Sequence, residues 1–336
     1  MKLLIVTQAV DKNDPLLGFF HAWILEFAKH TTQLTVFALR VGEHELPQNV
    51  TVVPLRGRKR NRVKTGLRFL YELYVRRDAY DAVFVHMNPE YVLLGGPTWK
   101  VLGKKVSLWY THKHVGFRLR LAEQFVDHLF TASKESLRLN SKKVRVMGHG
   151  IAMPAIAHVP GSSPAIRILT VGRISAAKKT QELLAALSVL HARGISFTCS
   201  VVGAPATRAD GEYYARLQER FRAEPFYTHV KWVGAVPHDT LPGVLSSADV
   251  FVNLSSTGSL DKAVLEALAA GVPAVTSNEA FKDMLSPVGL YVDSTNPQVI
   301  ASMIEKASKT DITELSHTVR KTHSLSELIP AILHTI

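Results

Sequence analysis

Several common features are missing from this sequence of 336 residues. A single cysteine, Cys199, excludes an internal disulfide framework and a cysteine-rich metal site. No stretch reaches the ~18 consecutive apolar residues of a membrane span, and the apolar run after Met1 is too short for a signal peptide. No G-x-G-x-x-G follows the first predicted strand, so the dinucleotide-binding fingerprint is absent. We therefore expect a globular protein of the cytoplasm.

An excess of negative charge is missing too, and the positive excess belongs to one half of the chain. Residues 1–160 contain 24 Lys and Arg against 12 Asp and Glu, whereas residues 161–336 contain 16 of each. The densest basic run lies at 56–64, and apolar or aromatic residues follow it at helical spacing. The cations predicted to face a partner are Arg58, Lys59, Arg60, Arg62 and Lys64.

An anionic membrane surface is the partner that this run favours. Such a surface attracts each nearby Lys or Arg by about 1 kcal/mol, and Leu67, Leu70 and Tyr74 would touch the interface. We therefore expect a peripheral contact on the inner face of the cytoplasmic membrane. Nucleic acid is the alternative partner, but no nucleic-acid-binding motif accompanies the run, so we do not expect nucleic acid as a partner.

Short apolar runs alternate with helical segments along the chain, which is typical of parallel α/β sheets. Residues 153–165 are rich in Pro, Ala, Gly and Ser without a hydrophobic period, which indicates a linker. We predict two Rossmann-like, doubly wound domains, at 1–155 and 165–320. Strands are expected at 2–7, 33–39, 50–55, 82–87, 104–112, 127–133, 144–151, 166–171, 197–203, 230–236, 250–254 and 274–277.

The stretch 255–273 carries the most informative local pattern. A small polar turn follows the predicted strand 250–254 and precedes a helix expected from about 260 to 270. Gly258 has no Cβ and Ser259 can cap the helix, so the turn offers backbone N–H groups to a phosphate. Glu266 lies four residues after Lys262, and the two side chains share a helix face. An ordinary strand–turn–helix with a surface ion pair fits the same residues.

Two further groups of polar residues stand at predicted strand ends. Arg173 and Lys178 follow the strand 166–171 at the start of a long helix, where they can converge on one diphosphate. Because cations are unfavourable at a helix N-terminus, a ligand explains them better than fold stability does. His112 ends the strand 104–112 and His114 follows it, but no third metal ligand stands out, and no metal is expected.

These patterns resemble the donor-binding signature of the retaining GT-B glycosyltransferases of family 4. Arg173 and Lys178 match its G-R-x4-K element. Glu266 matches the second Glu of its E-x7-E element and is followed by Ala267 to Pro273, as in the family. The first Glu of that element is replaced here by Gly258. The nearest acid is Asp261, so either Asp261 or a backbone amide would replace the usual contact with the donor sugar.

The resemblance implies a role for each candidate residue. Arg173, Lys178 and the helix start at Gly258 and Ser259 would stabilise the charge that grows on the leaving diphosphate, and Glu266 would hold the ribose. In the first domain, His112 would lie close to the anomeric carbon, and the loop after the first strand would face the cleft. The residues implied are catalytic Arg173, Lys178, His112 and Asp261 and donor-binding Glu266, Gly258, Ser259, Leu260, Lys262 and Gly18.

The resemblance also implies the architecture and the reaction. It predicts a GT-B fold, with two domains facing a cleft and a C-terminal helix at about 322–336 packing on the first. The implied reaction moves a sugar from a nucleotide-diphosphate sugar with retention of configuration and without cofactor or metal. The basic first half favours a lipid-linked or membrane-borne acceptor in glycan or cell-envelope biosynthesis. A catalytically weak GT-B binding subunit and a GT-B sugar-nucleotide epimerase stay open as alternatives.

Overall fold

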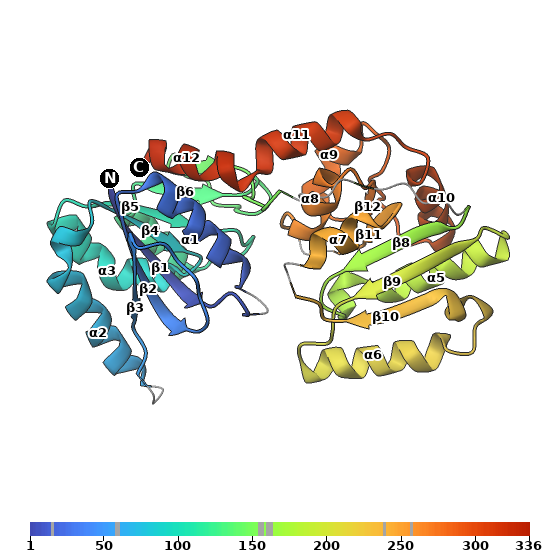
Figure 1. Ribbon diagram of the computed structural model, residues 1–336, viewed down its shortest axis with the longest axis horizontal. Coiled ribbons are helices and arrows are strands. Elements are labelled where there is room, and N and C mark those ends of the chain that lie inside the picture. Colours follow the sequence, from blue (N-terminus) through green and yellow to red (C-terminus); the bar gives the residue numbers. More distant parts are fainter. Residues whose placement is uncertain (15–16, 58–60, 154–157, 159–163, 238–239, 256–257) are drawn as a thin grey trace. The chain divides into compact units, whose positions relative to one another are not determined.

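The chain forms two compact units, each built on one parallel sheet (Figure 1). The computed structural model describes residues 1–14, 17–57, 61–153, 158, 164–237, 240–255 and 258–336. Met1–Ala152 and Thr322–Ile336 make the first unit, and Met153–Lys321 make the second. The predicted α/β class with two doubly wound parallel sheets is confirmed.

The sheet of the first unit has seven strands in the order β3-β2-β1-β4-β5-β6-β7. Its strands are β1 (Lys2–Val10), β2 (Gln33–Val41), β3 (Val50–Pro54), β4 (Ala82–His86), β5 (Lys105–Trp109), β6 (His128–Thr131) and β7 (Val144–Val146). Its helices are α1 (Phe19–His30), α2 (Arg62–Val75), α3 (Pro89–Val101), α4 (Phe117–Ala122) and α12 (Leu325–Thr335).

Helices cover both faces of this sheet, which is why β1 and β4 are apolar almost throughout. On one face, α2, α3 and α4 contribute Phe69, Trp99 and Leu119 to a core that includes alternate residues of β1 and β4. On the other face, Phe27 of α1 packs against Phe84 of β4, with ring centroids 5.0 Å apart. Because side chains of a strand point alternately to opposite faces, both layers are filled from the same short apolar runs.

The sheet of the second unit has five strands in the order β10-β9-β8-β11-β12. Its strands are β8 (Ile166–Val171), β9 (Phe197–Val202), β10 (Val230–Gly234), β11 (Val250–Asn253) and β12 (Ala274–Thr276). Its helices are α5 (Thr180–Ala192), α6 (Arg208–Phe221), α7 (Leu241–Ser246), α8 (Lys262–Ala269), α9 (Lys282–Leu285) and α10 (Pro297–Ala307), and α11 (Thr313–His323) follows them.

The bounds of three predicted elements differ from the expected ones. The predicted strand 144–151 stops at Val146, because Gly148 and Gly150 adopt positive φ angles of 84° and 65°. The predicted strand 104–112 pairs with β4 and β6 only as far as Trp109, so His112 lies in the following loop. The predicted helix 260–270 begins at Lys262, with Asp261 rather than Ser259 at its N-cap.

The C-terminal helix expected at about 322–336 corresponds to α12, which begins at Leu325. α11 ends at His323, and Ser324 caps α12 by accepting a hydrogen bond from the backbone N of Glu327. The apolar face of α12 is buried in the first unit, where Leu328 closely approaches Gly150. Ile151 also exchanges backbone hydrogen bonds with His323 and Leu325. These contacts attach the end of the chain to the first unit.

Candidate functional site

The two loops singled out in the second half leave the sheet side by side. The strand order of the second sheet reverses between β8 and β11, and ligands of parallel α/β sheets bind beyond the carboxyl ends of the strands at such a point. The loop after β8 contains Arg173 and Lys178, and the turn after β11 contains Gly258 and Asp261. The fold therefore brings the two predicted motifs to the position where a ligand is expected.

Close backbone packing shapes the loop after β8. A Cβ on Gly203, which follows β9, would lie 1.9 Å from the carbonyl oxygen of Gly172, so the two loops touch through backbone alone. The stem of Lys178 lies over Gly172, with Cε 3.5 Å from the position of a Cβ there. A 3-10 turn at Ala176–Lys178 then delivers Lys178 to the mouth of the loop before α5 begins.

Arg173 and Lys178 have different partners. The Arg173 side chain is 52% exposed, and its Nε lies 3.8 Å from Oδ2 of Asp210. A side-chain hydrogen bond with Thr207, followed by the charge of Arg173, lowers the pKa of Asp210. Lys178 is more enclosed, and its Nζ lies 2.5 Å from Oδ2 of Asp261. Lys178 is therefore held at the start of α8, whereas the Arg173 guanidinium is open to solvent.

Two buried asparagines hold the turn between β11 and α8. Asn253 accepts a hydrogen bond from the backbone N of Ser255 and donates one to Oδ2 of Asp261. The donor–acceptor distance is 3.1 Å in both. Asn278, after β12, donates to the carbonyl oxygen of Ser259 over 2.8 Å. Leu260 anchors the turn through a buried side chain. Sequence reasoning missed both asparagines, although a polar residue in an otherwise apolar strand end is a readable signal.

Gly258 and Glu266 each settle a point about the family pattern. Gly258 has φ +68°, a conformation that residues with a Cβ rarely adopt, so the backbone here suits glycine rather than the missing Glu. Glu266 is only 7% exposed on α8, so the alternative of a surface ion pair does not describe it. Lys262 is partly buried, and burial lowers its pKa to about 7, although Glu266 acts in the opposite direction.

In the first unit, His112 and Gly18 lie in loops at the carboxyl edge of the sheet. His112 is exposed, and its Nδ1 accepts a hydrogen bond from the backbone N of His114 over 3.1 Å. The proton of the neutral imidazole is therefore on Nε2, which is left to donate. Gly18 precedes α1, and a Cβ there would lie 2.7 Å from the carbonyl oxygen of Asp14. Its role is thus at least close packing of the loop after β1.

A buried histidine that the sequence reasoning missed stands at the corresponding reversal point of the first sheet, between β1 and β4. His86 ends β4, stacks on Phe20 at a centroid distance of 4.0 Å, and lies 3.2 Å from Oγ1 of Thr7. Gln8, in the last part of β1, donates a hydrogen bond to the side chain of Asn88, which follows β4, at a distance of 2.9 Å. His86 therefore connects the end of β4 with β1 and with α1, through Thr7 and Phe20.

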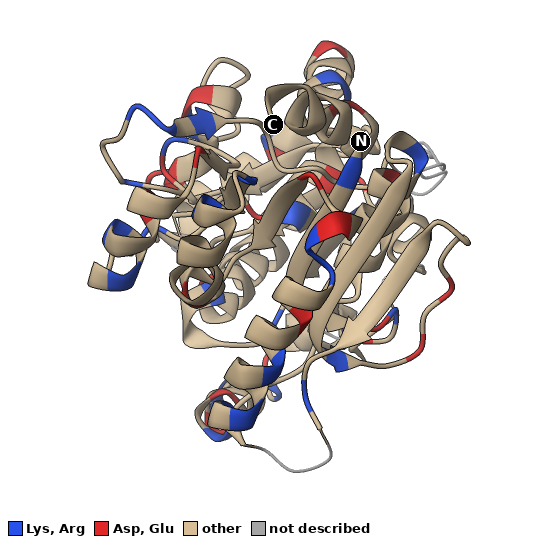
Figure 2. Ribbon diagram, turned by 90° about the vertical axis from the view of Figure 1, so that its left-hand side faces the viewer, with Lys and Arg blue, Asp and Glu red and all other residues tan. Residues whose placement is uncertain are grey.

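The predicted basic face is described in part. Figure 2 shows how Lys and Arg are distributed over the chain when the side that is on the left in Figure 1 faces the viewer. Arg58, Lys59 and Arg60 lie outside the described residues, whereas Arg62 and Lys64 are exposed in the first turn of α2. An apolar ridge runs beside these cations, since four residues of α2 are more than 60% exposed. They are Val63, Leu67, Tyr71 and Tyr74. In the part of the chain that the structure describes, no helix has the length and hydropathy needed to cross a bilayer.

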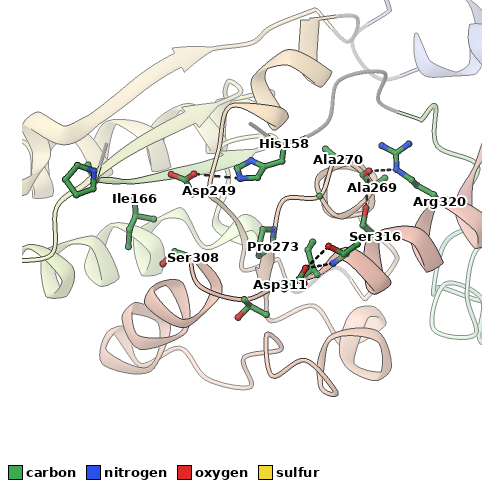
Figure 3. A pocket seen from close by; sticks show the side chains of 16 residues that line it. His158, Ile166, Asp249, Ala269, Ala270, Pro273, Ser308, Asp311, Ser316 and Arg320 are labelled. Carbon is green, nitrogen blue, oxygen red and sulfur yellow. Dashed lines mark hydrogen bonds and ion pairs between the residues drawn. The ribbon is translucent and has the colours of Figure 1, made fainter. Parts of the chain in front are cut away.

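A cavity of about 800 Å³ in the second unit lies at the opposite edge of the sheet (Figure 3). Ile166, Asp249 and Pro273 line it where β8, β11 and β12 begin. It is therefore separate from the loops that carry Arg173 and Lys178. Among the described residues, no cluster of three or more His, Cys, Asp or Glu side chains could hold a metal ion.

Comparisons with known proteins agree with this geometry. Residues 160–323 match the family described as Glycosyl transferases group 1. A curated relative, YtcC of Bacillus subtilis (strain 168), is 29% identical over 147 residues, which are 42% of this chain but only 36% of YtcC. Each of these two matches spans less than half of this chain.

Solved structures extend the likeness of fold to the whole chain. HepE from Anabaena, solved in complex with UDP, has a TM-score of 0.79 at 15% identity and covers 100% of this chain and 99% of its own. The lipopolysaccharide outer core galactosyltransferase WaaB has a TM-score of 0.72 at 14% identity, and both chains are covered fully. At such identities the likeness establishes the GT-B fold. With this fold and this match, residues 160–323 belong to the group 1 glycosyltransferase family.

Proposed function

We propose that this protein is a retaining, metal-independent glycosyltransferase that binds a nucleotide-diphosphate sugar at the carboxyl edge of its second sheet. The observation that carries the proposal is the contact of 2.5 Å between Lys178 and Asp261. It places a lysine from the loop after β8 at the N-terminus of α8, where the helix dipole favours an anion. Arg173, on the same loop, supplies a second cation that is open to a ligand.

The reaction needs a site that stabilises a departing diphosphate. The bond between the anomeric carbon and the β-phosphate oxygen breaks, and negative charge grows on that oxygen. Arg173, Lys178 and the backbone N–H groups at the start of α8 would stabilise this charge. Fixed donors aimed at a developing charge typically contribute about 10²–10³ each in rate. We assign these groups the main catalytic role.

Glu266, Lys262 and Asp261 would hold the remaining parts of the donor. A carboxylate can accept from two hydroxyls at once, which suits Glu266 for the ribose. Lys262 lies one turn before Glu266 and adds a cation to the diphosphate side. Both described hydrogen bonds to Asp261 end on Oδ2, so Oδ1 is left to accept from a hydroxyl of the donor sugar. Asp261 would thus replace the Glu that Gly258 excludes.

Retention of configuration needs no nucleophile from the protein. The acceptor hydroxyl would attack the anomeric carbon from the side of the leaving group, and its proton would pass to the departing phosphate oxygen. His112 would donate from Nε2 to the donor near the anomeric carbon, since its Nδ1 is already occupied. Gly18 would allow the loop after β1 to approach the donor closely.

The acceptor that fits the first unit best is lipid-linked or membrane-borne. The exposed ridge of Val63, Leu67, Tyr71 and Tyr74 lies beside the cations of α2, and this pairing is typical of helices that bind an anionic membrane surface. The α2 helix follows β3, so its N-terminus lies at the carboxyl edge of the first sheet. The likeness to WaaB, a lipopolysaccharide outer core galactosyltransferase, supports an acceptor of this class.

A panel of nucleotides tests the donor. We expect UDP to stabilise the protein, because the structural neighbour HepE was solved with UDP. At ~100 times its Kd, a nucleotide adds about 2.7 kcal/mol to the free energy of unfolding. Thermal shifts with UDP, GDP, ADP and TDP in parallel identify the base. If none of the four shifts the melting temperature, the proposed donor site is wrong.

Flotation with liposomes tests the membrane face. We expect the protein to float with vesicles containing anionic lipid and to be released at 1 M salt, where the Debye length falls to ~3 Å from ~10 Å at 0.1 M. Replacing Arg58, Lys59, Arg60 and Arg62 by Ser should abolish flotation and leave nucleotide binding unchanged. The matched control replaces exposed cations of the second unit, such as Arg216 and Arg222. If the wild type does not float with anionic vesicles, the result would favour a soluble glycan as the acceptor.

A further inference from the structure

We propose that Asn253 is a positioning residue that keeps Asp261 away from the N-terminus of its own helix, so that this N-terminus stays open for the donor diphosphate. The inference rests on the proposed function and extends it to a residue outside the motifs. Asn253 is buried, at 3% exposure, in the last position of β11. The Asn253 side chain is the link between the strand end and the helix start.

The position of Asp261 makes it a natural cap for α8. An Asp at the N-cap normally accepts a hydrogen bond from the backbone N–H two or three residues later, which stabilises a helix by ~1 kcal/mol. Here Asp261 makes no such bond. Among the described residues, the backbone N–H of Ala263 has no acceptor, and Val264 instead bonds to the carbonyl oxygen of Asp261. A capping group is thus present but turned away.

The carboxylate is held in this orientation by donors from two other elements. Asn253 Nδ2 lies 3.1 Å and Lys178 Nζ 2.5 Å from the same oxygen, Oδ2. The ammonium group of Lys178 is at the end of a flexible side chain and would turn toward a bound diphosphate. Lys178 therefore cannot keep Asp261 in place once a diphosphate is bound. Asn253 can, because its amide is buried and its other end is bonded to the backbone of Ser255.

Loss of the Asn253 amide would let Asp261 rotate onto the free N–H of Ala263. A carboxylate there would occupy the helix N-terminus and repel the diphosphate. In Asn253→Ala we therefore expect the affinity for UDP, and for inorganic pyrophosphate as a base-free probe, to fall by about tenfold or more, as for the loss of hydrogen bonds to a charged group. Because the damage comes from Asp261, removing Asp261 should repair it.

The decisive experiment is a rescue measured by titration calorimetry. Asn253→Ala should bind UDP weakly, and the double variant Asn253→Ala/Asp261→Ala should recover the affinity of Asp261→Ala alone to within about threefold. Asn278→Ala is the matched control, since Asn278 holds Ser259 in the same turn without touching Asp261. A loss in Asn278→Ala should not be repaired by Asp261→Ala. Asn253→Ser replaces Asn253→Ala if the latter does not fold, as judged by circular dichroism.

The outcomes separate the inference from the function beneath it. If the wild type binds UDP and Asn253→Ala binds it equally well, the positioning role is wrong and the proposed function stands. If the loss in Asn253→Ala persists in the double variant, Asn253 only supports the turn, and the inference is again overturned. If the wild type binds neither pyrophosphate nor any of the four nucleotides, the proposed function fails and this inference fails with it.

Discussion

The two units of the protein expose different surfaces. The first contains 24 Lys and Arg against 13 Asp and Glu, and one of its helices, α2, has four large apolar or aromatic residues that are each more than 60% exposed. The second contains 16 Lys and Arg against 15 Asp and Glu. Among its described residues, the large apolar side chains that are exposed are Val233 and Val299, at 39% and 42%.

The difference follows from what each unit is proposed to bind. A diphosphate requires a few cations and N–H groups at fixed positions, and the second unit holds them through specific contacts such as Lys178 to Asp261. A membrane surface requires only positive charge and apolar area near one face. The second unit is therefore recognisable from the spacing of residues and the first mainly from its composition. Reciprocal variants can separate the two functions.

The largest effect is expected from the cations of the second unit. Arg173→Ala or Lys178→Ala should lower kcat by about 10²–10³, because each removes a charge from the departing diphosphate. Neither should change flotation with anionic vesicles, because the proposed membrane face is in the other unit. Turnover is measured with the donor identified by the nucleotide panel. Arg216→Ala on α6, an exposed cation of the same unit, is the control and should retain wild-type turnover.

A smaller effect is expected from Glu266. In Glu266→Ala the nucleoside loses hydrogen bonds to a charged group, which are worth about 1.5–3 kcal/mol. Affinity for UDP should therefore fall by roughly 10- to 150-fold, whereas affinity for inorganic pyrophosphate should change little, since pyrophosphate has no ribose. An equal loss for both ligands would contradict the ribose contact and would indicate that the buried Glu266 supports α8 instead.

The sequence predicted elements and motif positions well because they depend on local patterns. The apolar runs of β1 and β8 and the small residues around Gly258 are visible without a structure. It did not predict that Asp261 would face Lys178, 83 residues away, because only the parallel pairing of β8 with β11 brings the two loops together. The helix α8 also begins at Lys262 rather than at Leu260, with Asp261 at its N-cap in place of Ser259.

In the first unit the sequence was informative about charge and less so about individual residues. The basic run and the helical spacing of Leu67 and Tyr71 anticipated an exposed amphipathic helix. His86 was not identified, because one histidine in an apolar strand is usually part of the core, and only the pairing of β4 with β1 places it beside Thr7. The roles of His112 and Gly18 stay predictions.

A substitution of Gly258 is expected to lower the free energy of unfolding by about 1–2 kcal/mol. Its φ of +68° is strained for any residue with a Cβ, at a cost of about 1–2 kcal/mol per residue. Restoring the family's Glu in Gly258→Glu should therefore lower the melting temperature and leave turnover no better than in the wild type. Gly258→Ala measures the strain alone. Higher turnover in Gly258→Glu at unchanged stability would mean that the turn accepts the family's contact and that Asp261 does not replace it.

The last prediction is a dependence of the free energy of unfolding on pH that comes from Lys262. Its pKa is lowered by burial to about 7 in the folded protein, against about 10.4 for an unfolded lysine. Between these values the unfolded chain binds the proton and the folded chain does not, so the free energy of unfolding should rise with pH in this window. Below pH 7 both states are charged, and the full cost of burying the ammonium is present.

Comparison of the wild type with Lys262→Met isolates the contribution of Lys262 to the pH dependence of stability. The difference in melting temperature, wild type minus variant, should increase from pH 6.5 to pH 9.5, because Met has no proton to lose. Binding of UDP should act in the opposite direction, since a diphosphate favours the charged lysine. Calorimetry at pH 8 in buffers of different ionisation enthalpy should then show proton uptake on binding, approaching one proton, in the wild type but not in Lys262→Met. Binding without proton uptake, at an affinity that is constant from pH 7 to 9, would show that Lys262 does not face the diphosphate, and the anion site would consist of Arg173, Lys178 and the N–H groups of α8.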